Sequence, residues 1–282
     1  LYLGALTIQS VMGIPLLYGV IGLALFAVVY SINGGLKAVA LTDVIQVFFL
    51  VGGGLITTYI ALDLLGAGEG VLKGCETLYL KTEDKFHLIL DPSHPGYMDL
   101  PGLSVILGGL WVANLYYWGC NQYIIQRALA AKNIKEAQWG MAFAGVIKLL
   151  IPLLVVIPGI AAFALDAPLS KPDEAYPWLL GNLLPVGVKG IAFAALTAAI
   201  VSSLASMMNS ISTIFTMDIY QVYIRPEGDA SHLVRVGKMT SLVAMLIGVC
   251  IAPLLSGLDQ AFQYIQEFTG FVSPGALSIF LA

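Results

Sequence analysis

Charged residues are scarce in this sequence: Asp, Glu, Lys and Arg make up only 11% of its 282 residues. An ordinary soluble domain carries roughly 25% charged residues, so this chain could not cover a surface that faces water. Hydrophobic residues make up 59% instead, and they recur in runs of about 20, long enough to cross a hydrocarbon core of roughly 30 Å as helices. The alternating pattern of a transmembrane barrel strand is absent. The composition therefore predicts an all-α polytopic membrane protein.

The motifs of several other protein classes are also missing. The three cysteines, Cys75, Cys120 and Cys250, are too few and too scattered for a disulfide framework, and no cluster of Cys or His has metal-ligand spacing. The G-x-S-x-G, P-loop and G-x-G-x-x-G sequences of common enzymes do not occur, so we do not expect an enzyme. The net charge of −4 and the lack of a basic stripe with interleaved aromatic residues argue against a nucleic-acid partner.

Seven apolar stretches are predicted to span the membrane, and residues 1–10 would be the tail of an eighth span. The predicted spans are 14–30, 43–64, 101–127, 140–166, 187–220, 239–257 and 261–282. The chain begins without Met and stops inside the apolar run LSIFLA. We therefore expect residues 1–282 to be a single transmembrane domain and an internal piece of a longer protein.

The connections between these spans differ in charge. Short loops that carry Lys and Arg next to span ends favour the cytoplasm, which places 31–42, 128–139 and 221–238 on that side. Residues 65–100 would then form a long external loop with a short helix before DPSHPGY, and 167–185 a second external loop.

The stretch NLYYWGCNQYIIQR, residues 114–127, gathers much hydrogen-bonding capacity at the end of an apolar span. In one continuous helix, Asn114, Tyr117, Trp118 and Asn121 share a face. Amides beside aromatic rings suit a neutral polyol or sugar, because hydroxyls accept and donate hydrogen bonds while C–H faces stack on a ring. An interfacial aromatic belt is the alternative; it explains the end of the stretch well but leaves Asn114 unexplained.

Lys148 lies within the predicted span 140–166, about 12 Å from its cytoplasmic end at 1.5 Å per residue. Its ammonium either extends to the interface or donates to a ligand hydroxyl or a carboxylate. Pro152 and Pro158 follow in the same span, which predicts a kinked helix. A later span, AFQYIQEFTGFVSPG, carries Gln266 and Glu267 at a depth where polar side chains need partners.

The segment 194–213 is rich in small and hydroxylated residues. Close helix packing explains most of them, but Ser202 and Ser203, with Ala199 one turn earlier, could also supply oxygen ligands to a hard cation such as sodium. Asp43 follows Thr42 at the predicted start of a span. It would either cap that helix or take part in cation passage or gating.

Several motifs in the same order resemble the sodium/solute symporter family. They are YSINGGLKAVALTDVIQ (30–46), NQYIIQRALAAK (121–132), AAIVSSLASMMNS (198–210) and FTMDIY (215–220). The resemblance implies a secondary-transporter fold of two inverted five-helix repeats with discontinuous helices. Residues 1–282 would hold the end of the first repeat and most of the second.

The resemblance also implies roles for individual residues in binding a sugar. Asn114, Lys148 and Gln266 match positions that hydrogen-bond the sugar in the family. Tyr117 matches the aromatic residue that caps the sugar on its inner side and gates its release, and Trp118 lies beside it as a wall of the pocket.

A second set of residues matches the family's sodium ligands. Ser202 and Ser203 would bind the ion through their hydroxyls and Ala199 through its backbone carbonyl, while Asp43 matches an aspartate on the cation path. The remaining ligands of both sites would lie before residue 1, so the chain would hold about half of each site.

The expected function is sodium-coupled symport of a neutral sugar, galactose or glucose, across the plasma membrane by alternating access. The partners would be the sugar, the sodium ion and the lipid bilayer. Other possibilities are a family symporter for myo-inositol, proline or sialic acid, a membrane sensor domain fused to a signalling module, and a channel.

Overall fold

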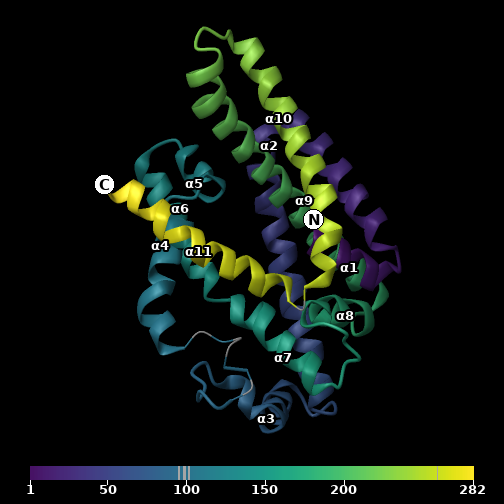
Figure 1. The fold of residues 1–282 in the computed structure, drawn as a ribbon. Helices are drawn as coiled ribbons and strands as arrows, with labels where there is room; N and C mark the ends of the chain where they lie inside the picture. Colours follow the sequence, from purple (N-terminus) through teal and green to yellow (C-terminus); the bar gives the residue numbers. More distant parts are fainter. Residues whose placement is uncertain (95, 98–99, 101, 259) are drawn as a thin grey trace. The chain divides into compact units, whose positions relative to one another are not determined.

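A computed structural model of the chain describes residues 1–94, 96–97, 100, 102–258 and 260–282, and within 33 and 35–38 it describes the backbone but not the side chains. Lys37 of the predicted connection 31–42 is among these last residues, so its side chain lies outside the description. The described residues form helices joined by turns, without a strand (Figure 1). The elements are α1 (Tyr2–Met12), α2 (Leu16–Leu65), α3 (Val71–Lys81), η1 (Glu83–Phe86), η2 (Val105–Gly109), α4 (Leu110–Gly119), α5 (Gln122–Leu129), α6 (Ile134–Lys148), η3 (Pro152–Val156), α7 (Ile157–Ala164), η4 (Pro172–Glu174), α8 (Ala175–Asn182), α9 (Val186–Thr213), η5 (Ile214–Ile224), α10 (Ala230–Ile251), η6 (Ala252–Gly257) and α11 (Ala261–Leu281).

The chain divides into two compact units. Unit 1 comprises Leu1–Gly53 and Pro185–Gly257, and unit 2 comprises Gly54–Leu184 and Leu258–Ala282. The first part of α2 therefore belongs to unit 1 and its last part to unit 2.

Helix α2 replaces the predicted loop at 31–42, because its backbone is helical from Leu16 to Leu65. It is not straight, however. Tyr30 and Thr42 are twelve residues apart, about 18 Å along a straight helix, yet their hydroxyls are hydrogen-bonded to each other. The chain therefore bends sharply between the predicted spans 14–30 and 43–64, but through helical backbone rather than through a loop.

Small residues let the helices of unit 1 approach closely. A Cβ atom on Gly4 of α1 would lie 2.8 Å from Ile200 of α9, and one on Gly19 of α2 would lie 3.2 Å from Ala5. Helix α10 packs along α9 and its π-helical continuation η5. This is the packing expected of membrane helices, in which small side chains at the contact allow the backbones to meet.

The core of unit 2 is also built from small and aliphatic residues. Ala61, Leu62, Ala161, Ala162 and Leu179 are among its buried members, and they come from α2, α7 and α8. The predicted short helix in the external loop 65–100 is present as α3. It packs tightly on α2, because a Cβ atom on Gly74 would lie only 1.9 Å from the carbonyl oxygen of Leu62.

One feature of unit 2 differs from the predictions and another agrees with them. The predicted external loop 167–185 contains a short helix, α8, after the 3₁₀ turn η4. The kink expected from the prolines of the span 140–166 is confirmed, since Ile134–Lys148 and Pro152–Ala164 meet at 40°.

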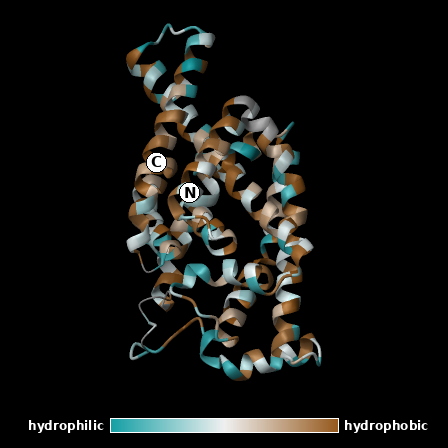
Figure 2. Ribbon diagram, turned by 90° about the vertical axis from the view of Figure 1, so that its right-hand side faces the viewer, coloured by the Kyte–Doolittle hydropathy of each residue, from teal (hydrophilic) through white to brown (hydrophobic). Residues whose placement is uncertain are grey.

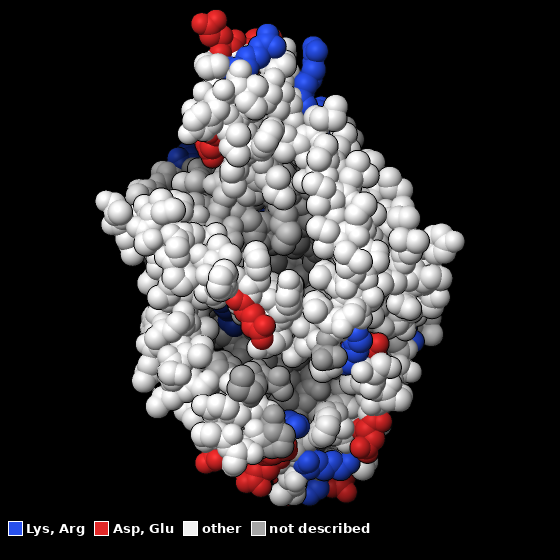
Figure 3. Space-filling view, in the orientation of Figure 1, with Lys and Arg blue, Asp and Glu red and all other residues white. Residues whose placement is uncertain are grey.

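Many large apolar side chains are exposed; Phe48 on α2 is 76% exposed and Phe271 on α11 is 87% exposed. Three described stretches are long and apolar enough to cross a membrane, namely Val39–Leu65, Val186–Ile224 and Ala230–Gly257, and a fourth is the bent pair of α6 with η3 and α7. Figure 2 shows hydrophobic residues along the long helices, and Figure 3 shows charged side chains gathered at the turn between η5 and α10. Such surfaces are those of an integral membrane protein.

Candidate functional site

The predicted sugar-binding residues Asn114, Tyr117 and Trp118 lie on α4 in unit 2, where Asn114 and Trp118 are one turn apart on the same face. The indole Nε1–H of Trp118 donates a hydrogen bond to Asn114 Oδ1 at 3.3 Å, and Asn114 Nδ2 donates to the Leu110 carbonyl at 2.8 Å. The rings of Tyr117 and Trp118 meet edge to face, with centroids 5.2 Å apart and planes at 81°. These contacts hold the Asn114 amide and the Trp118 ring in one orientation.

Lys148 joins this group from another helix. It is the last residue of α6, which ends there because Pro152 lacks the N–H that would bond to the Lys148 carbonyl. Its Nζ lies 3.9 Å from the centroid of the Trp118 ring, a distance at which an ammonium is attracted to the ring face. The structure thus brings Asn114, Trp118 and Lys148 into one connected group, and the ammonium contacts an aromatic ring instead of extending away from the protein.

Gln266 lies on α11, the helix that packs along α4. Its side chain is exposed, and the described contacts do not join it to the group around Trp118. On the same helix, Gln263 Nε2 donates to Glu267 Oε1 at 3.2 Å, so these two polar residues partner each other across one turn.

Asn121 does not share the face of Asn114, contrary to the prediction. Helix α4 ends at Gly119, and Asn121 is the N-cap of α5, its side chain accepting from the Tyr123 N–H at 3.1 Å. Gly and Asn favour a helix break and a cap over an uninterrupted helix. The prediction of a single helix through 101–127 is therefore wrong between Gly119 and Gln122. Helical periodicity suggested no role for Asn121, and the structure shows that it caps α5.

The predicted sodium residues lie in unit 1 on α9. Ser202 is only 2% exposed, Ser203 and Ala199 are half-buried, and all three belong to one continuous helix. The Ser202 hydroxyl donates a hydrogen bond to a carboxylate oxygen of Asp43 on α2. The helix-cap interpretation of Asp43 is wrong, because this residue lies inside α2 and its carboxylate is directed at α9.

These groups have the chemistry that sodium requires. Two hydroxyls, a carboxylate and a backbone carbonyl are hard oxygen ligands, the type that alkali and alkaline-earth cations prefer. The carbonyl of Ala199 lies in helical backbone, where it retains a second lone pair beside its intrahelical hydrogen bond. The residues of unit 1 therefore fit a sodium ion, with Asp43 supplying a negative charge.

A polar contact between distant segments of unit 1 was not predicted from the sequence. The Ser31 hydroxyl on α2 donates to Asn209 Oδ1 on α9 at 3.2 Å. Both residues lie in the quoted motifs 30–46 and 198–210, and a polar side chain in an apolar helix is itself a signal. The two residues are 178 positions apart in the sequence, so no local pattern indicates that they pair.

A model of the sodium:solute symporter family matches residues 1–282. The chain is 55% identical over 298 aligned residues to a sodium/glucose cotransporter of Vibrio parahaemolyticus, covering 100% of this chain and 55% of that protein. It is 35% identical over 311 residues to sodium/glucose cotransporter 4 of Danio rerio, with 100% and 47% covered. It is also 32% identical over 318 residues to the human sodium/myo-inositol cotransporter 2, with 100% and 45% covered.

The chain spans about half the length of the curated relatives it matches. Among solved structures, a sodium-coupled sialic acid symporter in a substrate-bound, outward-open state matches with a TM-score of 0.78 at 23% identity, covering 98% of this chain and 57% of that one. This likeness confirms the predicted all-α fold class, because the chain shares the fold of that symporter.

Proposed function

Because the chain belongs to the sodium:solute symporter family, we propose that the full-length protein carries a neutral sugar together with sodium across the plasma membrane. The observation that supports this most directly is the connected group of the Asn114 amide, the Trp118 ring and the Lys148 ammonium. It presents hydrogen-bonding groups beside an aromatic surface, which is the combination that a sugar requires.

Each member of the group has a distinct task in this proposal. The Lys148 ammonium has three N–H donors, so it can rest on the Trp118 ring and still donate to sugar hydroxyls. Asn114 offers its amide, and Gln266 adds a second amide from α11. Tyr117, whose ring lies against Trp118, covers the sugar on its inner side and moves when the sugar leaves.

Sodium binding is assigned to Ser202, Ser203 and the carbonyl of Ala199, with Asp43 on the path of the ion. The buried Ser202 hydroxyl already bonds to the Asp43 carboxylate, so an ion that binds Ser202 also meets a negative charge. If sodium raises the affinity for sugar, the sugar raises the affinity for sodium by the same factor, so each ligand favours the binding of the other.

The choice of a neutral sugar rests on the uncharged amides and on the relatives named for glucose. Relatives named for myo-inositol support a polyol of similar chemistry. Lys148 favours one further candidate, an acidic sugar such as sialic acid, because its ammonium could pair with a carboxylate.

The test is sodium-driven uptake by the full-length protein in proteoliposomes. Galactose, glucose, myo-inositol and sialic acid are offered in turn, with and without a sodium gradient, and the binding of each is measured separately by a scintillation proximity assay. We expect a saturable, sodium-dependent isotherm for galactose or glucose. Saturable binding of sialic acid alone would contradict the neutral substrate, and uptake without sodium would contradict the coupling.

Two variants separate the sites. Lys148→Ala should abolish sugar uptake, whereas Lys135→Ala, a matched change near the start of the same helix, should leave it intact. Ser203→Ala should weaken sodium activation more than it weakens sugar selectivity. Wild-type uptake by Lys148→Ala, or unchanged sodium activation in Ser203→Ala, would count against the corresponding assignment.

A further inference from the structure

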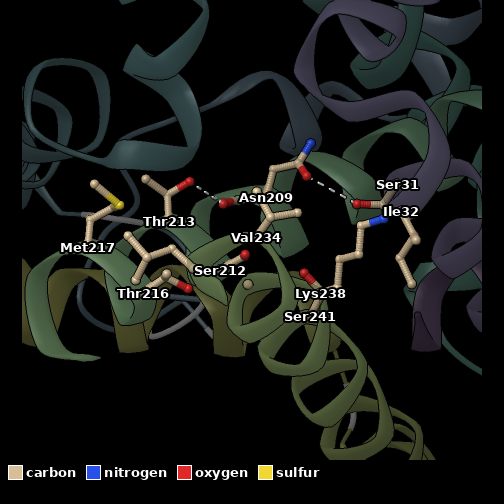
Figure 4. A pocket seen from close by; sticks show the side chains of 12 residues that line it. Ser31, Ile32, Asn209, Ser212, Thr213, Thr216, Met217, Val234, Lys238 and Ser241 are labelled. Carbon is tan, nitrogen blue, oxygen red and sulfur yellow. Dashed lines mark hydrogen bonds between the residues drawn. The ribbon is translucent and has the colours of Figure 1, made fainter. Parts of the chain in front are cut away.

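Unit 1 contains a pocket of about 400 Å³ between the first part of α2, the end of α9 with η5, and α10. Figure 4 shows that its walls carry hydroxyl and amide groups. None of the residues assigned above to sugar or sodium lines it. The pocket is therefore separate from the transport sites already described.

Two polar atoms of this pocket are buried without a hydrogen-bond partner in the described part of the chain. They are Nδ2 of Asn209 and Oγ1 of Thr216, and Thr216 as a whole is only 5% exposed. The orientation of Asn209 has a cause, because its Oδ1 accepts from the Ser31 hydroxyl at 3.2 Å and so leaves the N–H₂ group as an unused donor. Buried polar groups are almost always satisfied in folded proteins, and an exception calls for an explanation such as a bound water, ion or ligand.

A glycine on α10 lies against two hydroxyls of this pocket. A Cβ atom on Gly237 of α10 would lie 2.7 Å from the Ser212 hydroxyl and 3.5 Å from that of Thr216. Because glycine has no side chain, α10 can come close to both hydroxyls, and a larger residue at position 237 would displace the Ser212 hydroxyl.

Among the described residues that line the pocket, the charged side chain is a lysine. Lys238 lines it and extends its side chain from α10 toward Ser31 (Figure 4). The twelve described lining residues include no aspartate or glutamate. The Lys238 ammonium, the Asn209 N–H₂ group and the Thr216 hydroxyl are hydrogen-bond donors among these lining groups.

We propose that this pocket binds the phosphate group of an anionic ligand. Lysine binds phosphate as a point charge, Asn209 Nδ2 and the Thr216 hydroxyl would each donate to one of its oxygens, and a cation is disfavoured by Lys238. The ligand would be either inorganic phosphate or the headgroup of an anionic lipid. Lys238 lies at the end of the predicted cytoplasmic connection 221–238, where basic pockets between membrane helices meet such headgroups.

The experiment uses the full-length protein in nanodiscs and follows its thermal unfolding. One arm titrates inorganic phosphate against chloride of equal ionic strength in discs of phosphatidylcholine. The other compares phosphatidylcholine alone with equal parts of phosphatidylcholine and phosphatidylglycerol. A rise in the unfolding temperature in the first arm identifies the free anion, and a rise confined to the second identifies the lipid headgroup.

Three variants make the assignment specific. Lys238→Met should weaken phosphate binding about tenfold or more, the loss expected from one charge-assisted hydrogen bond, whereas Arg235→Met, on the same helix but outside the pocket, should respond like the wild type. Thr216→Val keeps the side-chain volume; it should be at least as stable as the wild type without phosphate and less responsive to it. A wild type without a shift in either arm, or a Lys238→Met variant with the full shift, would overturn the proposal.

Discussion

Trp118 is the residue whose substitution tests the sugar site most sharply, because it makes two separable contacts. Its indole N–H holds Asn114 at 3.3 Å, and its ring face holds the Lys148 ammonium at 3.9 Å from the centroid. Phenylalanine would retain a ring beneath Lys148 and lose only the N–H donor. Leucine would lose both contacts.

The magnitudes follow from the environment. Trp118 is 37% exposed, so the lower ends of the usual ranges apply: about 0.5–1 kcal/mol for the hydrogen bond and about 0.5–1 kcal/mol for the cation–π contact. If the two contacts order Asn114 and Lys148 for the sugar, Trp118→Phe should weaken sugar binding about 2- to 5-fold and Trp118→Leu about 5- to 30-fold, since 1.4 kcal/mol corresponds to a factor of ten.

The assay is sugar binding to the full-length protein at saturating sodium, followed by a sodium titration at fixed sugar. Trp111→Phe and Trp111→Leu are matched controls on the same helix, since Trp111 is 65% exposed. The sodium dependence should change only through its linkage to sugar binding. Equal losses in Trp118→Phe and Trp118→Leu would refute a role for the ring beneath Lys148, and tighter binding in Trp118→Leu would mean that Trp118 sequesters the lysine instead of positioning it.

Further predictions concern sodium, packing and pH. Asp43→Asn should raise the sodium concentration for half-maximal uptake, because it keeps an acceptor for Ser202 but removes the charge; unchanged activation would contradict a place on the cation path. Gly74→Ala should lower the unfolding temperature in detergent strongly, because its Cβ atom would lie 1.9 Å from a backbone carbonyl, whereas Gly140→Ala, with open space around it, should not. The pKa of Asp229 is held below its usual range by hydrogen bonds from the neighbouring serine hydroxyl and a backbone N–H. Asp229 is the N-cap of α10, and because its pKa is depressed in the folded state, the stability it contributes is present above the unfolded pKa and is lost as the pH falls through the folded pKa. The unfolding temperatures of wild type and Asp229→Asn should therefore converge in acid. A difference that stays constant with pH would contradict this.

The sequence determines the class of this protein and much of its local structure. Apolar runs with so few charges predict membrane helices whatever their arrangement, and Pro152 predicts the kink after Lys148 because a missing N–H is a local property. The resemblance to a transporter family rests likewise on ordered motifs, and the comparisons confirm it. One local signal gives a wrong prediction. Periodicity predicts a single helix through Asn121, whereas α4 ends at Gly119 and Asn121 caps α5.

The contacts between distant segments were decided by the tertiary structure alone. From the sequence, Asp43 is as compatible with a helix cap as with a place on the cation path. Only the tertiary structure shows that its carboxylate accepts a hydrogen bond from the buried hydroxyl of Ser202, 159 positions away. Lys148 had two interpretations until its ammonium was found on the ring of Trp118. The type and spacing of residues determine what a helix can offer, but the partner of each side chain depends on how helices pack. In this chain that packing depends on glycines and on a sharp bend in α2, neither of which shows in periodicity.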